Sequence, residues 1–470
     1  MKSIFIVLLA LLSVSLADSI TCNATTSCPE ESPCCSQFGI CGTGAYCLGG
    51  CDIRYSFNLS SCMPMPRMDS FSESFDSKQK VSEIELQSLY LGNASEADWV
   101  YTGWVDYYDE SLLLQMPNHT TGTVLSSTKY FWYGKVGATM KTSRTGGVVT
   151  AFILFSDVQD EIDYEFVGYD LVNPQSNYYA QGILNYTNSE NSTVNNTFEY
   201  YHTYEMDWQE DKIDWYVDGE KVRTLHKSDT WNETLNRYNY PQTPSRIQVS
   251  LWPGGDPTNG EGTIEWAGGL VNWDSEDIQN HGYFYAQVKD IYMEAYDLPE
   301  HVLLKGNSTK GDDYHAFLYN DTKGDDTDIY LTNRKTWLGS DDATGFDPQN
   351  ENDPVVDESE TTIVTTSGSS TITSVSTATS STQRTANVPA QNTAAANQGN
   401  SNANTASSRP TTSANTYNPS AGVGGFVQDS RSSSTTSGDG SSSSGSAGRL
   451  NDGIMGMVGA IALGAISFFV

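Results

Sequence analysis

The stretch Phe152-Ile-Leu-Phe-Ser-Asp-Val-Gln-Asp-Glu-Ile-Asp-Tyr-Glu-Phe-Val-Gly168 alternates acidic and apolar side chains over its second half. The alternating residues are Glu161, Ile162, Asp163, Tyr164, Glu165 and Phe166. Because successive side chains of a β-strand point to opposite faces, the acids share one face and the apolar residues share the other. The stretch therefore predicts a strand whose apolar face belongs to a core and whose acidic face is open to water or takes part in chemistry.

Three interpretations of the acidic face are open: a solvated strand face, an acidic cation site, or a pair of reacting carboxylates. A retaining glycosidase needs two carboxyl groups about 5–5.5 Å apart. The Cα atoms of Glu161 and Glu165 lie about 13 Å apart on a strand that rises about 3.3 Å per residue. Long Glu side chains that lean together over a concave sheet can close that gap. Asp163 between them would hydrogen-bond the nucleophile and influence how the pair ionises.

The stretch Asp160 to Glu165 resembles the active-site strand of glycoside hydrolase family 16, in its Glu-x-Asp-x-Glu form. The segments Trp252-Pro-Gly-Gly-Asp-Pro257 and Gly262-Thr-Ile-Glu-Trp-Ala-Gly-Gly269 are similar to motifs of the Crh-type transglycosylases of fungal cell walls, which join chitin to β-glucan. Two further stretches, His202 to Trp208 and Ile213 to Gly219, support the resemblance. It covers roughly Phe71 to Tyr296.

The resemblance implies catalytic roles for the three acids. Glu161 is expected to attack the anomeric carbon as the nucleophile. Glu165 is expected to bind substrate, to protonate the leaving oxygen, and later to take a proton from the acceptor. Asp163 is expected to hold Glu161 in place. No metal ion and no cofactor are expected.

The segment from Arg67 to Tyr296 alternates short apolar and aromatic runs with Gly, Asn, Asp and Ser turns, and it lacks a sustained helical period. Many strands without alternating helices favour an all-β sandwich. The resemblance implies a curved antiparallel β-sandwich, a concanavalin-like jelly roll, with the substrate cleft on its concave sheet.

The segment Ser245 to Trp252 predicts a second strand with two distinct faces. The apolar residues Ile247, Val249 and Leu251 share its core face, whereas Gln248, Ser250 and Trp252 share the other face. Trp252 is predicted to be a sugar-stacking platform, although Trp in a β protein is more often packed inside. Gln248 lies on the same face and is a second candidate sugar contact. Thr263 is a third candidate, by resemblance alone.

All eight cysteines lie between Cys22 and Cys62, which marks one small disulfide-stabilised module. Eight cysteines allow 105 pairings, so spacing alone does not fix the bridges. The run from Cys34 to Cys47 resembles the hevein-type chitin-binding module. That resemblance implies the pairs Cys22 with Cys35, Cys28 with Cys41, Cys34 with Cys47, and Cys51 with Cys62.

The same resemblance places three side chains of the module at sugar-contacting positions: Ser36, Phe38 and Tyr46. The module departs from the family at Ile40, where another aromatic residue is usual. Two interpretations therefore stay open, a working chitin binder and a disulfide-bonded spacer.

Composition excludes several classes of function. A formal charge of −33 argues against binding nucleic acid, whose phosphates require a basic surface, and is compatible with neutral polysaccharide. The sequence has no His-Glu-x-x-His pair, no Gly-x-Ser-x-Gly and no phosphate-binding Gly-Lys loop. Zinc protease, esterase and nucleotide-binding interpretations therefore lack support.

Both ends of the chain carry processing signals. Met1 to Ala17 reads as a secretory signal peptide, which makes disulfides and N-glycans expected. The terminal apolar tail reads as a glycosylphosphatidylinositol (GPI) anchor signal, with a retained membrane helix as the alternative. The predicted attachment residue is one of Ser441, Ser442, Ser443, Ser444 and Gly445.

The predicted organisation has six segments. They are a signal peptide (1–17), the cysteine-rich module (18–63), the catalytic domain (67–298), an acidic extension (299–360), a disordered Ser/Thr-rich stalk (361–445) and a removed anchor propeptide (446–470).

These features together predict a secreted, monomeric, surface-anchored wall enzyme. It is expected to cut β-1,4-linked chitin and transfer it to a β-1,3- or β-1,6-glucan acceptor. The alternatives are a hydrolase of chitin or β-glucan that does not transfer, and an inactive wall lectin or mannoprotein.

Overall fold

The computed structural model describes residues 19–306, 308–345 and 362–363. The expectations for the signal peptide, the anchor propeptide, the attachment residues Ser441 to Gly445 and almost all of the stalk concern residues outside this part. Within the described ranges, no helix is both long and apolar enough to cross a membrane.

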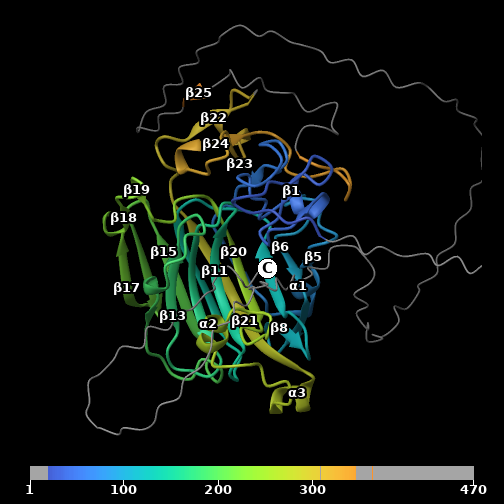
Figure 1. The fold of residues 1–470 in the computed structure, drawn as a ribbon, viewed down its shortest axis with the longest axis vertical. Helices are drawn as coiled ribbons and strands as arrows, with labels where there is room; N and C mark the ends of the chain where they lie inside the picture. Colours follow the sequence, from blue (N-terminus) through green and yellow to red (C-terminus); the bar gives the residue numbers. More distant parts are fainter. Residues whose placement is uncertain (1–18, 307, 346–361, 364–470) are drawn as a thin grey trace, which may run out of the picture.

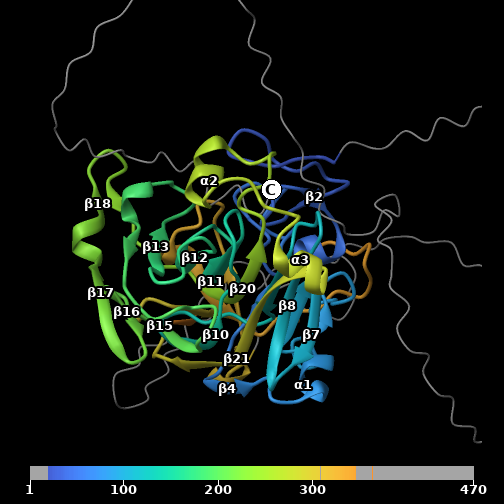
Figure 2. The same ribbon diagram turned by 90° about the horizontal axis from the view of Figure 1, so that it is seen from below.

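Two eight-stranded sheets form the body of the described protein, and they lie face to face as two layers (Figure 2). The first, called the acidic sheet here, runs in the order β14 (Glu190–Asn191), β13 (Gln175–Tyr179), β12 (Glu161–Val167), β11 (Val149–Ser156), β20 (Ser245–Trp252), β9 (Thr123–Ser127), β6 (Trp99–Thr102) and β5 (Glu85–Leu86). The second, the back sheet, runs in the order β17 (Glu220–His226), β16 (Lys212–Val217), β15 (His202–Trp208), β10 (Gly134–Lys141), β21 (Tyr283–Ala295), β8 (Ser111–Pro117) and β7 (Trp104–Tyr108), and β4 (Phe71–Ser74) also pairs with β21.

Nearly every neighbouring pair in these sheets is antiparallel, and β5 with β6 is the parallel exception among them. The α-helices are short: α1 (Lys78–Ser82), α2 (Glu261–Trp266) and α3 (Glu276–His281). A small hairpin, β18 (Trp231–Asn232) with β19 (Arg237–Tyr238), lies at one side (Figure 1). The all-β sandwich that the sequence predicts is confirmed.

The core lies between the two sheets and contains the side chains that alternation assigns to it. Those side chains are Ile162, Tyr164 and Phe166 of β12 and Ile247, Val249 and Leu251 of β20, all buried in one cluster. Burying each such side chain stabilises the fold by about 1.5–3 kcal/mol. Two hydrogen bonds join the sheets across this core. Tyr164 Oη donates to the Tyr216 carbonyl at 3.0 Å, and Trp215 Nε1 donates to the Asp163 carbonyl at 3.2 Å.

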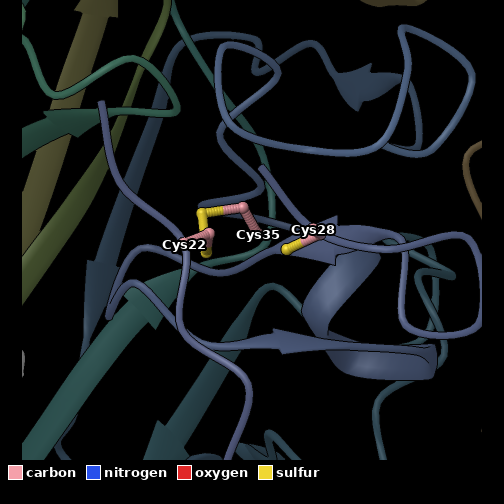
Figure 3. Close-up of side chains that lie close together, drawn as sticks. All are labelled: Cys22, Cys28 and Cys35. Atoms are coloured by element: carbon pink, nitrogen blue, oxygen red, sulfur yellow. A yellow bond between two sulfur atoms is a disulfide. The ribbon is translucent and has the colours of Figure 1, made fainter. Parts of the chain in front are cut away.

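The cysteine-rich segment contains β1 (Cys34–Cys35), β2 (Cys41–Gly42) and a 3-10 turn at Gly44–Cys47. Its four disulfides join Cys22 with Cys35, Cys28 with Cys41, Cys34 with Cys47, and Cys51 with Cys62, the pairs that the hevein resemblance implies. Figure 3 shows the sulfur atoms of Cys22, Cys28 and Cys35 close together. Because all three sulfur atoms belong to disulfides, they offer no thiolate to a metal ion.

The acidic extension contains more regular structure than its sequence suggests. Strands β22 (Leu303–Lys305), β23 (Ala316–Tyr319) and β24 (Ile329–Thr332) form a sheet with β3 (Met65–Pro66) and β25 (Thr362–Ile363). The acids that dominate this segment lie in its turns, whereas the strand residues Phe317 and Leu331 are buried in the main core cluster. The sequence predicts only an acidic extension here, whereas the short apolar runs between its acidic turns form strands.

The cysteine-rich segment and the extension lie together at one end of the sandwich (Figure 1). The Gly44 N–H donates to the Ala343 carbonyl at 2.9 Å, so the extension contacts the cysteine-rich segment directly. The Gly50 N–H donates to Asp157 Oδ1 at 2.8 Å, so the same segment also contacts the turn before β12. These contacts hold the described parts of the three predicted segments together.

Candidate active site

The turn that leads into β12 is fixed by Asp160, the first acid of the motif. Gln159 has a φ of +64°, a left-handed conformation that closes the turn between β11 and β12. The Asp160 carboxylate accepts four hydrogen bonds of 2.7–3.1 Å, from the N–H groups of Gln181, Gln242 and Thr243 and from the Thr243 hydroxyl. Asp160 therefore positions the start of the acidic strand. No pattern in the sequence indicated this role.

The three acids that follow point away from the core, on the outer face of the acidic sheet. Glu161 is 3% exposed, Asp163 is 0% exposed and Glu165 is 6% exposed. Their register partners on β13 are Tyr179, Asn177 and Gln175, and those on β11 are Phe155, Ile153 and Ala151. Paired residues in antiparallel strands share a face, so these side chains surround the acids.

Burial changes how these acids ionise. It raises the pKa of Glu165 to about 8. Burial, followed by the charge of Glu165, raises the pKa of Glu161 well above its usual range. Burial and both glutamates do the same to the pKa of Asp163. Carboxyl groups whose pKa values lie above the usual range suit a site that must both donate and accept a proton.

Several polar atoms around the acids are buried without a hydrogen-bond partner in the described residues. They are both carboxylate oxygens of Asp163, Asn177 Oδ1, Gln248 Oε1 and Ser250 Oγ. Buried polar atoms are rarely left unpaired, because each costs about 1–3 kcal/mol. A ligand that carries many hydroxyl groups would supply the missing partners.

Trp252 lies on the predicted outer face of β20, but it is only 5% exposed. It packs beside Val149 and Val167 and stacks on Trp266 of α2, with ring centroids 6.1 Å apart and planes 20° apart. Trp266 is half-buried, and its Nε1 donates to Gln175 Oε1 at 2.8 Å. Trp266 is therefore the more accessible ring beside Glu165. It belongs to the motif that begins at Gly262, which was the available signal.

The other two predicted sugar contacts are buried. Gln248 of β20 is opposite Ile153 of β11, whose other register partner is Asp163. It therefore lies on the acidic face, two strands from the acids. Thr263 lies inside the short helix α2, which begins after Gly260.

The three predicted contacts of the cysteine-rich module do not form a free surface. Ser36 and Phe38 are buried, and Tyr46 is half-buried against the main core cluster. Phe38 packs against the outer face of β11. The side chains that the hevein resemblance assigns to sugar contact are therefore mostly covered by other parts of the chain.

Comparison with known proteins identifies relatives of this chain. The glycosyl hydrolases family 16 profile matches residues 93–268. Crh-like protein UTR2 of Candida albicans is 70% identical over 459 residues, which are 97% of this chain and 96% of that protein. Congo red hypersensitive protein 2 of Saccharomyces cerevisiae is 51% identical over 330 residues, 70% of this chain and 69% of that protein. A solved structure, Crh5 transglycosylase in complex with NAG, has 26% identity and a TM-score of 0.47, and the match covers 60% of this chain and 99% of that one.

Proposed function

Because this chain belongs to family 16 of the glycosyl hydrolases and, within it, to the Crh-like proteins, we propose that it is a retaining transglycosylase of the fungal cell wall. It cleaves β-1,4-linked chitin and transfers the new reducing end to β-glucan. The observation that carries this proposal is the acidic face of β12, where Glu161 and Glu165 lie buried among polar atoms that have no hydrogen-bond partner in the described part of the chain.

In the first step, a carboxylate oxygen of Glu161 forms a bond to the anomeric carbon while the glycosidic C–O bond breaks. Glu165 gives its proton to the leaving oxygen, which departs as a hydroxyl group on the released chain. The raised pKa of Glu165 supports this role, because the group then still carries a proton near neutral pH.

In the second step, a hydroxyl oxygen of the glucan acceptor attacks the anomeric carbon of the glycosyl ester. Glu165 takes the hydroxyl proton, and the bond between the sugar and Glu161 breaks, so the enzyme returns to its starting state. Two displacements at one carbon retain its configuration. The step needs no metal ion or cofactor.

Asp163 acts on Glu161 rather than on the sugar. Its raised pKa favours the protonated form, which donates a hydrogen bond. Directed at Glu161, that bond would orient the nucleophile and disperse its negative charge. Gln248 and Trp266 are proposed to contact sugar, and Trp252 and Thr263 to shape the surface around them.

The processing signals of the sequence support a location at the cell surface. Met1 to Ala17 directs secretion, and the tail from Ser446 to Val470 is exchanged for a GPI anchor at one of the residues from Ser441 to Gly445. The protein then works as a monomer at the boundary between membrane and wall.

The test incubates the mature full-length protein with chitin oligosaccharides and a fluorescent β-1,3-glucan oligomer. Larger labelled products are expected from wild type, and none from Glu161→Gln. Shortened donors without larger labelled products would show that the enzyme hydrolyses chitin and does not transfer it. An unchanged mixture would favour a wall protein that binds sugar without reacting.

A further inference from the structure

The cysteine-rich segment places an aromatic ring on the acidic face. Phe38 is only 7% exposed, and it packs in a separate cluster with Ala151, Ile153 and Phe155 of β11. These are outer-face side chains of the acidic sheet, so the ring lies on the side where the acids lie. Figure 2 shows the segment on that outer side.

Strand register places the ring close to the reacting groups. The β11 residues beneath Phe38 pair with the three acids of β12: Ala151 with Glu165, Ile153 with Asp163, and Phe155 with Glu161. Neighbouring strands lie about 4.8 Å apart. Phe38 is therefore about one strand away from the whole row of acids. A sugar chain that crosses from β12 toward β20 meets this ring at once.

Gln37, the residue before Phe38, is hydrogen-bonded to the same sheet. Its Oε1 accepts from Arg246 Nη2 at 2.6 Å and from Gln248 Nε2 at 3.1 Å. The second bond fixes the amide of Gln248 and leaves Gln248 Oε1 buried and without a partner among the described residues. Ser250 Oγ, on the same face of β20, is in the same condition. An aromatic ring beside unpaired polar atoms matches a sugar, which has apolar faces and polar edges.

The backbone of the segment lies close against side chains of the sheet. A Cβ added at Gly49 would lie 2.4 Å from Arg246 Nη1, and one added at Gly50 would lie 2.9 Å from Arg246 Nη2. The Gly50 N–H also donates to Tyr130 Oη at 3.0 Å, besides Asp157. Backbone this close to the sheet holds Gln37 and Phe38 at defined positions.

We propose that the cysteine-rich segment forms one wall of the active site, and that Gln37 and Phe38 determine which sugar chain is accepted beside the scissile bond. Phe38 contacts the sugar ring on the β11 side of β12, and Gln37 orients Gln248 toward its hydroxyl groups. The inference rests on the proposed transglycosylase function. It assigns the segment to the substrate site rather than to chitin capture at a distance.

The test compares Phe38→Ala, Phe38→Tyr and Gln37→Ala in the mature full-length protein. Phe57→Ala is the matched control, because Phe57 is an aromatic residue of the same segment and is 45% exposed. KM, kcat and product lengths are measured on soluble oligosaccharides, with thermal unfolding in parallel. Phe38→Ala is expected to raise KM about tenfold and to change the product lengths, because one lost ring contact weakens binding by that order. Gln37→Ala should change product lengths less, and Phe38→Tyr should retain the wild-type values.

Each outcome separates the inference from the proposed function. Absence of transfer by wild type would refute the function itself. If wild type is active, equal KM values and product lengths for Phe38→Ala, Gln37→Ala and Phe57→Ala would refute the proposal that the segment forms a wall of the active site. It is also refuted if Phe38→Ala loses kcat together with thermal stability and leaves the product lengths unchanged, since that is the result of lost packing alone.

Discussion

Two parts of the acidic sheet bury acids in opposite ways. At the end covered by the cysteine-rich segment, Asp160 accepts four hydrogen bonds. Three residues further along the chain, Asp163 is equally buried, yet both its oxygens lack a partner among the residues that the structure describes. A buried acid with all its hydrogen-bond partners stabilises the fold, whereas a buried acid without them costs stability. The same residue type thus stabilises the fold at one place, and in the proposed mechanism it orients Glu161 at the other.

The largest effect is expected at the centre of the sheet. Glu161→Gln and Glu165→Gln should each reduce transfer by at least about a thousandfold, because bond making and proton transfer each need one of these carboxyl groups. Thermal unfolding should stay unchanged or occur at a higher temperature, since each amide removes a buried titratable acid. Rates with the labelled acceptor and unfolding curves check both statements. If either variant kept a tenth of wild-type activity, the assignment of β12 as the catalytic strand would be wrong.

The opposite pattern is expected at the covered end. Asp160→Ala removes the acceptor of four hydrogen bonds, so the free energy of unfolding should fall by about 3 kcal/mol or more. Denaturant unfolding measures the loss. Activity should fall only with the folded fraction and should recover at low temperature. If the variant were as stable as wild type, the hydrogen bonds of Asp160 would not stabilise the fold, and the two parts of the sheet would not differ in this respect.

Asp163→Asn should reduce transfer by about tenfold to a hundredfold, because the amide can still donate a hydrogen bond but alters charge and orientation. Stability should not decrease, because the site contains no partner for Asp163 to lose within the described chain. The two aspartate variants therefore form a matched pair, one that affects stability and one that affects rate. A destabilised Asp163→Asn would show that this residue also supports the fold.

The rate should depend on pH through the same buried cluster. Glu165 must be protonated to act as the acid, so transfer should fall as pH rises through about 8. The raised pKa of Glu161 moves the acidic limb upward as well, because the nucleophile must lose its proton. A rate profile from pH 4 to 10, with unfolding followed at each pH, tests this. An alkaline limb far from pH 8 in a folded protein would contradict the assignment of Glu165.

The smallest effect is expected at the edge of the site. Trp266→Ala should raise KM about fivefold to tenfold with little change in unfolding, because its half-buried ring lies beside Glu165. Trp252→Ala is the control and should mainly reduce stability, because Trp266 stacks on that ring and Val149 and Val167 pack beside it. If the two variants exchanged these effects, Trp252 would regain the role of sugar platform that its sequence motif predicts.

Local patterns in the sequence predicted those features of the structure that depend on residues close together in the chain. A period of two assigned both faces of β12 and β20, and the motif resemblance implied the roles of the acids and the four disulfide pairs. The roles of Asp160 and Gln37 depend on partners far along the chain, since Thr243 lies 83 residues after Asp160 and Arg246 lies 209 residues after Gln37. No local pattern reports such partners. The strands of the extension were missed for a related reason, because one of their neighbours is β3, which precedes the whole sandwich.

The contact between the cysteine-rich segment and the extension has a consequence for synthesis. Thr43 Oγ1 donates to the carbonyl of Asp341, 298 residues later, at 3.3 Å. Chains are made at roughly 5–20 residues per second, so about 15–60 s separate the two partners during translation. The disulfides span only 11–13 residues and can close early. Phe38 must remain uncovered until β11, the strand on which it packs, has been made, and the contact of Thr43 with Asp341 can form only later still.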